Sequence, residues 1–158
     1  IARVNPKATV VEANSPPVLA DPDLVRGKRV LVIEDGPTLT HGGMKIGAGV
    51  VASQRHGAAA LVDPRPYLVG SLVDTFRTYP DIGTLLPAMG YGADQIKDLE
   101  ATINGADCDV VVIGTPIDLG RILEIDKPHT RVTYDLAEIG SPNLTEILSR
   151  FAKERGIG

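Results

Sequence analysis

The stretch Arg29–Gly49, RVLVIEDGPTLTHGGMKIGAG, decides the fold of this chain. An apolar run from Val30 to Ile33 leads directly into Glu34 and Asp35, and a glycine-rich segment follows. A continuous apolar run of this kind is typical of a parallel strand that is buried on both faces. In open α/β sheets, ligands bind at the carboxyl ends of the strands. The stretch therefore predicts a ligand site at the two acids.

Strand and helix patterns alternate from Lys28 to the end of the chain. Strands are expected at 28–33, 59–62, 84–88, 109–113 and 131–134, preceded by a short one at 8–13, and helices at 47–56, 71–78, 93–104 and 119–125. Such alternation predicts right-handed crossovers and a parallel sheet covered by helices on both faces. The expected fold is a three-layer α/β domain, Rossmann-like or P-loop-NTPase-like, with a mostly parallel sheet of about five or six strands.

A last helix is expected after Ser141, which would be its N-cap, with Pro142 in the first turn. It should bury Leu144, Ile147, Leu148 and Phe151, which recur at helical spacing.

Composition narrows the class of protein. The 158 residues suit one α/β domain over residues 1–158, and a net charge of −4 without basic clusters argues against a nucleic-acid partner. No apolar stretch approaches the roughly 18 residues of a membrane span. The single cysteine, Cys108, excludes an internal disulfide and a cysteine-rich zinc site. We expect a cytoplasmic protein, and the opening at Ile1 suggests the C-terminal part of a longer nucleotide-binding protein.

The paired acids Glu34 and Asp35 are the first candidate site. An acid at a strand end can hold Mg²⁺, directly or through water, because this cation prefers oxygen ligands. We therefore take both as candidate metal ligands and Asp35 as a candidate catalytic residue. The alternative is that the two acids simply face solvent.

The loop that follows is a candidate phosphate site. Gly42 and Gly43 would let backbone N–H groups approach an anion, and the start of the helix at 47–56 would add its positive end. Lys45 and His41 would add charge and hydrogen bonds, with His41 as a second candidate catalytic residue. The alternative is a tight connection between strand and helix.

Thr115 and Asp118 follow the strand at 109–113 directly. GTPases place Asn-Lys-x-Asp at such a strand end to bind the guanine ring, and this chain reads Thr-Pro-Ile-Asp there. Both residues are therefore candidate nucleotide ligands. Alternatively, Asp118 is the N-cap of the short helix that follows.

Arg65 lies between Pro64 and Pro66 after another strand. A stiff loop of this kind suits a guanidinium contact to a phosphate or carboxylate. A solvated arginine in a surface turn is the other interpretation. The glycine-rich segment 87–92 is expected near the same edge of the sheet.

Two phosphate-binding motifs are missing from the sequence. It contains neither G-x-x-x-x-G-K-[ST] nor G-x-G-x-x-G. The chain thus has one strand end suited to Mg²⁺, at Glu34 and Asp35, and one suited to a nucleotide base, at Thr115 and Asp118, but no phosphate loop. These are the features expected of half of a nucleotide-binding protein.

Four blocks together carry a resemblance to a known family. They read VLVIEDGPTLTHGGMKIGAGVVA, LVDPRPYLVGSL, LLPAMGYGADQIKDLEATIN and CDVVVIGTPIDL. In these blocks the chain resembles the predicted GTPases related to cyclic 2,3-diphosphoglycerate synthetase. The resemblance implies an upstream half that supplies the missing P-loop, with Glu34 and Asp35 at a Walker B-like strand end. Pro116 stands where these proteins have lysine, which leaves adenine and guanine both open.

Three functions follow as expectations. The first is the nucleotide-binding region of a GTPase or ATPase that transfers phosphoryl groups with Mg²⁺ and GTP or ATP. The second is an ATP-dependent ligase of the cyclic 2,3-diphosphoglycerate synthetase type, with a small phosphorylated acid as substrate bound by Arg65 and Lys45. The third is a non-catalytic, Rossmann-like binding or dimerisation module, and formation of a homodimer is left open.

Overall fold

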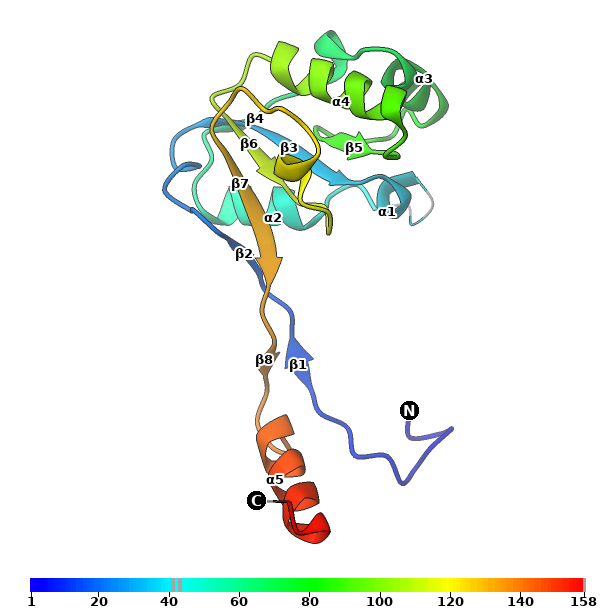
Figure 1. Ribbon diagram of the computed structural model, residues 1–158, viewed down its shortest axis with the longest axis vertical. Coiled ribbons are helices and arrows are strands. Elements are labelled where there is room, and N and C mark those ends of the chain that lie inside the picture. The colour runs from blue at the N-terminus through cyan, green and yellow to red at the C-terminus, as the bar shows by residue number, and fades with distance from the viewer. Residues whose placement is uncertain (41, 43, 158) are drawn as a thin grey trace. The chain divides into compact units, whose positions relative to one another are not determined.

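The computed structural model describes residues 1–40, 42 and 44–157. The chain divides into two compact units, one made of Pro17–Thr133 and the other of Ile1–Pro16 with Tyr134–Gly158. The larger unit holds the α/β sheet (Figure 1). That one domain extends over all of residues 1–158 stays a prediction.

A six-stranded sheet forms the centre of the larger unit, with strand order β2-β7-β6-β3-β4 and with β5 also paired to β3. Its strands are Pro17–Leu19 (β2), Arg29–Asp35 (β3), Ala60–Leu61 (β4), Leu86–Ala88 (β5), Val110–Ile113 (β6) and His129–Tyr134 (β7). The pairs of β3 with β4, β5 and β6, and of β6 with β7, are all parallel. This confirms the mostly parallel α/β sheet and is consistent with a Rossmann-like fold.

The burial of β3 explains its sequence. It is a central strand, with β6 on one side and β4 and β5 sharing the other, and its residues from Val30 to Glu34 are all buried. β4 pairs with the start of β3 and β5 with its end, where Asp35 lies opposite Ala88. A strand covered on both faces needs apolar side chains on both, which is why Val30 to Ile33 do not alternate with polar residues.

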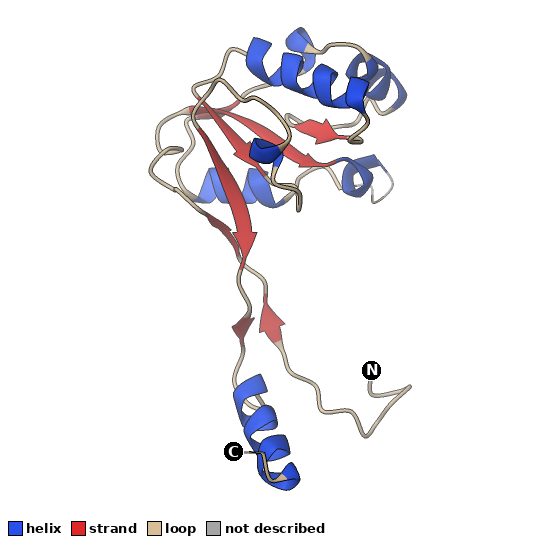
Figure 2. Cartoon of the chain, viewed as in Figure 1, coloured by secondary structure: helices blue, strands red, loops and turns tan. Residues whose placement is uncertain are grey.

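Helices cover both faces of this sheet, with α2 on one face and α3 and α4 on the other (Figures 1 and 2). The helices of the larger unit are Gly36–Thr40 (α1), Ala48–Arg55 (α2), Ser71–Thr78 (α3) and Ala93–Gly105 (α4), with single 3₁₀ turns at Arg65–Tyr67 and Leu119–Arg121. The helix expected at 119–125 is thus only one 3₁₀ turn. α1 was not expected, because Gly36 and Pro37 indicate a loop. Proline is tolerated in a first helical turn, however, where its missing N–H has no helical partner.

Among its described residues, the smaller unit contains a two-residue antiparallel ladder and one helix. Ala13–Asn14 (β1) pairs with Ala137–Glu138 (β8), so the strand expected at 8–13 is wrong over most of its length. The helix is Leu144–Arg155 (α5). Its N-cap is Asn143 rather than Ser141, because Asn143 Oδ1 accepts a 2.8 Å hydrogen bond from the Glu146 N–H and the Glu146 carboxylate accepts one from the Asn143 N–H.

The expectation that α5 buries its apolar face is also wrong. All of α5 lies within the described residues, and none of them is buried. Leu148 is 62% exposed and Phe151 50% exposed. Helical spacing reveals an apolar face, and packing decides whether that face is covered.

The described helices include none with the length and apolar character needed to cross a membrane.

The core and α5 should respond differently to loss of a leucine side chain. Leu31→Ala removes a fully buried side chain from β3 and should lower the free energy of unfolding by about 2–5 kcal/mol. Leu148→Ala should change it by less than about 0.5 kcal/mol, because the side chain is exposed. Urea denaturation followed by circular dichroism measures both. A loss above 1 kcal/mol at Leu148 would show that the α5 face is covered.

Candidate functional site

The carboxyl ends of β3, β5 and β6 bring three polar side chains together. Asp35 ends β3, Tyr91 follows β5, and Thr115 follows β6 after Gly114. The side chain of Tyr91 is hydrogen-bonded to that of Thr115. Burial raises the pKa of Tyr91, and the nearby negative charge of Asp35 acts in the same direction. The hydrogen bond with Thr115 acts in the opposite direction and is a smaller effect than burial. The structure therefore places an acid, a phenol and a hydroxyl at the edge where α/β sheets bind ligands.

Glu34 is the buried acid of this edge, with only 3% of its surface exposed. Its Oε1 accepts a 3.0 Å hydrogen bond from the backbone N–H of Val50, in the first turn of α2. The first N–H groups of a helix have no partner within the helix, so a carboxylate there satisfies a donor and interacts favourably with the helix dipole. Glu34 thus joins the end of β3 to the start of α2.

Three glycines enclose the Glu34 carboxylate. A Cβ built on Gly47 would overlap the carboxyl group, one on Gly49 would lie 3.0 Å from Oε1, and one on Gly114 would lie 2.6 Å from Oε2. Contacts this short are rarely tolerated, so any larger residue at Gly47 or Gly114 would displace the carboxyl group. The glycines after β3 and β6 therefore make room for an acid of the chain itself.

Burial governs the charge of Glu34. Desolvation raises its pKa to about 7, with a smaller contribution from the charge of Asp35, while the hydrogen bonds from Val50 and Gly49 act in the opposite direction. The group therefore titrates near neutral pH, where an ordinary glutamate is fully ionised.

Asp35 is partly exposed and organises α1. Its Oδ2 accepts hydrogen bonds from the Thr38 hydroxyl at 2.8 Å and from the Thr38 N–H at 3.3 Å. These are the contacts of an N-cap residue. Both go to Oδ2, so α1 does not use Oδ1.

These contacts decide how well the two acids fit a magnesium ion. Glu34 is a poor fit as a direct ligand, because it is buried and bound to the start of α2. Asp35 fits as a single ligand through Oδ1, since Mg²⁺ is commonly held by one or two carboxylates with waters and phosphates. The described residues include no group of three or more side chains that could bind a metal. Asp35 as a metal ligand stays a prediction.

The predicted phosphate loop is only partly described. His41 and Gly43 lie outside the described residues, while the N–H of Gly42, which follows α1, donates to the Pro37 carbonyl in α1 at 3.3 Å. The start of α2 was expected to bind a phosphate here. Its N–H at Val50 already donates to Glu34.

Arg65 is held by contacts within the chain. Its guanidinium pairs with Asp63 at 3.0 Å, donates to the carbonyl of Ile82, and lies over the Phe76 ring at 5.1 Å from the centroid. These contacts fix the loop after β4 to the start of the segment that leads into β5. The expected role of Arg65 as a phosphate ligand stays a prediction.

Asp118 forms ion pairs with two arginines. Its Oδ2 lies 3.2 Å from Arg131 Nη1, on β7, and 3.3 Å from Arg121 Nε. Although it occupies the N-cap position of the 3₁₀ turn, its side chain makes no cap hydrogen bond among the described residues. Binding a guanine ring would require the carboxylate to exchange these guanidinium partners for the ring N–H groups.

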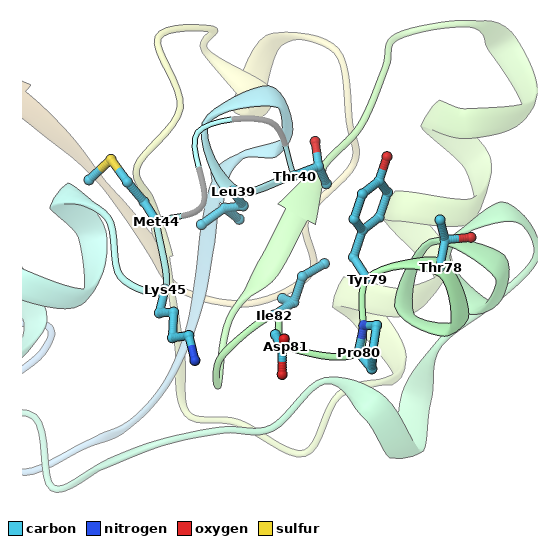
Figure 3. A pocket seen from close by; sticks show the side chains of 9 residues that line it. All are labelled: Leu39, Thr40, Met44, Lys45, Thr78, Tyr79, Pro80, Asp81 and Ile82. Carbon is cyan, nitrogen blue, oxygen red and sulfur yellow. The ribbon is translucent and has the colours of Figure 1, made fainter.

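A pocket of about 290 Å³ lies beside α1 and the turn between α3 and β5 (Figure 3). Its lining includes Lys45, which was a candidate in the sequence analysis, and Asp81 and Tyr79, which were not. No motif marks the segment 78–82, and its polar residues are typical of any turn between a helix and a strand. Only the tertiary structure brings it opposite Lys45.

The titration of Glu34 predicts a specific dependence of stability on pH. The folded state holds the Glu34 proton more tightly than the unfolded chain, with a pKa of about 7 against 4.5. The contribution of Glu34 to stability is therefore fully present below about pH 4.5 and falls by roughly 3 kcal/mol by pH 8. Glu34→Gln keeps an acceptor for the Val50 N–H and removes the charge. The variant should match the native protein at pH 5 and be more stable at pH 8.

Chemical denaturation of both proteins from pH 5 to 8 measures this difference. Glu154→Gln, which removes the charge of an exposed glutamate on α5, is the control. Parallel curves for the native protein and Glu34→Gln would contradict the burial of the acid.

The glycines around Glu34 should not tolerate a side chain. Gly114→Ala places a methyl group against Glu34 Oε2 and 3.0 Å from the Ile33 carbonyl, and should cost about 1–3 kcal/mol. Gly105→Ala, at the end of α4 with no atom within 4 Å of the new Cβ, is the matched control and should be neutral or slightly stabilising. Thermal unfolding of the two variants compares them. Equal melting temperatures would contradict the close packing around the carboxylate.

Comparison with known proteins found one informative relative. The chain is 60% identical over 153 residues to a protein named arginine synthetase ArcE from Thermococcus kodakarensis. The match covers 97% of this chain and 34% of the relative, so the chain spans about a third of that protein's length. No protein-family model matches the chain, and no solved structure matches it. The chain is thus similar to part of a synthetase, while the link to cyclic 2,3-diphosphoglycerate synthetase stays a prediction.

Proposed function

We propose that this chain is part of an ATP-dependent ligase that forms arginine. The observation that carries this proposal is the 60% identity to arginine synthetase over 97% of the chain. A match over 153 of the 158 residues takes in β3, α1, α2 and the later strand ends, which supports a ligand edge common to both proteins. A ligase of this kind couples formation of a bond in the product to cleavage of a phosphoanhydride bond of ATP.

The contacts of Asp118 favour ATP over GTP in this proposal. Guanine recognition at this strand end relies on an aspartate that accepts two N–H groups of the ring. Here the same carboxylate is engaged by Arg121 and Arg131. The proposed function is therefore an ATP-dependent ligase, the class of the second expectation of the sequence analysis, with an amino acid in place of the small phosphorylated acid expected there.

The residues at the strand ends would have separate roles. Asp35 would hold Mg²⁺ through Oδ1, directly or through water, and the ion would neutralise phosphate charge when bound. Tyr91, which is partly exposed, would hydrogen-bond a ligand at the same edge. Thr115 is buried and its hydroxyl donates to the Ile117 carbonyl at 2.8 Å, so it would position Tyr91. Glu34 would position this edge without touching the nucleotide, because its carboxylate is enclosed by glycines.

The test is arginine formation by the protein in its full natural length, with ATP or GTP and with or without Mg²⁺. Asp35→Asn keeps an N-cap side chain for α1 and weakens a magnesium ligand. It should lower kcat by about 10²-fold, the order expected when an electrostatic contact to a transferring group is lost. Asp94→Asn, exposed at the start of α4, is the matched control and should keep full activity.

Arginine formation that is as fast with GTP as with ATP would contradict the choice of nucleotide. An Asp35→Asn variant as active as the Asp94→Asn control would contradict the role of Asp35. Absence of arginine formation by the native protein would contradict the ligase itself.

A further inference from the structure

The pocket between α1 and the α3–β5 turn combines charged and apolar groups in a small volume. Its volume of about 290 Å³ is near the lower end of the range for small-molecule sites, roughly 300–1,000 Å³. Leu39 and Ile82, which are both buried in the core, supply apolar lining on the side of the pocket that they face. Lys45 and Asp81 supply one charge of each sign. A pocket of this size and lining suits a small molecule with an aliphatic stem.

Figure 3 shows how the polar groups are divided. The Lys45 ammonium and the Asp81 carboxylate point toward one end of the pocket in this view, and the hydroxyls of Thr40 and Tyr79 toward the other. The side chains of Leu39 and Ile82 lie between these ends. The lining therefore runs from charged through apolar to hydroxyl-bearing groups.

Lys45 and Asp81 form no ion pair within the described part of the chain. The ion pairs found there involve other acids, and none includes Lys45 or Asp81. Side chains of opposite charge in one pocket that are not paired with other groups are available to a ligand that carries both charges. An α-amino acid presents a carboxylate and an ammonium on one carbon, which matches this pair.

We propose that this pocket is the amino-acid subsite of the ligase. The α-carboxylate of the ligand binds Lys45, its α-ammonium binds Asp81, and its aliphatic side chain packs on Leu39 and Ile82. The polar end of that side chain reaches Thr40 and Tyr79. This inference rests on the proposed function for the identity of the amino acid, and it assigns a site that is separate from the nucleotide edge.

The position of α1 supports this division. Asp35 caps the start of α1, while Leu39 and Thr40 lie at its end. A five-residue helix is about 7.5 Å long. The proposed phosphate end of the nucleotide and the amino-acid subsite would therefore lie at opposite ends of one short helix, which would place the two substrates near each other.

The test is calorimetric binding of L-arginine, the product of the proposed reaction, to the protein in its full natural length. Agmatine, which has the same side chain without the carboxylate, is the second probe. L-arginine should bind, and agmatine should bind at least about tenfold more weakly, because it lacks the group that contacts Lys45. Lys45→Met should weaken L-arginine binding about tenfold and leave agmatine binding unchanged, whereas Asp81→Asn should weaken both.

Lys97→Met and Asp94→Asn, both exposed on α4, are the matched controls and should bind both probes like the native protein. Circular dichroism of each variant confirms that it is folded. In the activity assay, Lys45→Met should raise KM for the amino-acid substrate and leave KM for ATP unchanged.

The outcomes separate this inference from the proposed function. Arginine formation with native-like L-arginine binding in Lys45→Met and Asp81→Asn overturns the subsite and leaves the ligase intact. Absence of arginine formation together with the expected losses of L-arginine binding supports the subsite and overturns the ligase. Absence of L-arginine binding to the native protein, or agmatine binding as tight as that of L-arginine, also overturns the subsite.

Discussion

The hydrogen bond from the Val50 N–H to the buried Glu34 carboxylate is the interaction on which this structure depends most. It joins the carboxyl end of the central strand to the first turn of α2. Because Gly114 also packs against the same carboxyl group, the exit of β6 is drawn to this point as well. One side chain thus fixes three segments that come from distant parts of the sequence.

This interaction also gives the two neighbouring acids, Glu34 and Asp35, different environments. In β3 successive side chains point to opposite faces, so Glu34 and Asp35 cannot share one environment. Glu34 faces α2 and is buried, whereas Asp35 is partly exposed and caps α1. The acid pair therefore contributes one buried carboxylate that contacts α2 and one partly exposed carboxylate that caps α1.

The sequence predicted the strands from β3 to β7 well because their patterns are local, and it missed the short strands β2 and β8. The apolar runs of β3 and β6 are sufficient to identify buried parallel strands, and the limits of α3 were predicted as the structure has them. α1 was missed because Gly36 and Pro37 favour a loop unless an acid caps the helix. The exposure of Leu148 and Phe151 was missed because periodicity reveals a face and does not reveal its neighbours.

The candidate site was harder to predict because its residues meet through tertiary contacts. The start of the helix at 47–56 was expected to add its positive end to a phosphate site, and in the structure the first turn of α2 contacts Glu34. Arg65 and Asp118 were identified as residues with useful chemistry, but their partners Phe76, Ile82 and Arg131 are not adjacent in sequence. No sequence motif around Asp81 indicated a site. The strand-end rule locates the edge, and only packing tells which polar groups at that edge remain free for a ligand.

The state of Glu34 can be measured directly by NMR in protein labelled with ¹³C at the glutamate side-chain carboxyl carbons. The resonance of Glu34 is assigned as the one that Glu34→Gln removes, and its chemical shift is followed from pH 3 to 9. The account predicts a titration midpoint of about 7, set by burial between β3 and α2. A midpoint near 4.5, the value of an ordinary glutamate, would contradict it, because the carboxylate would then be open to solvent and free to serve as a ligand.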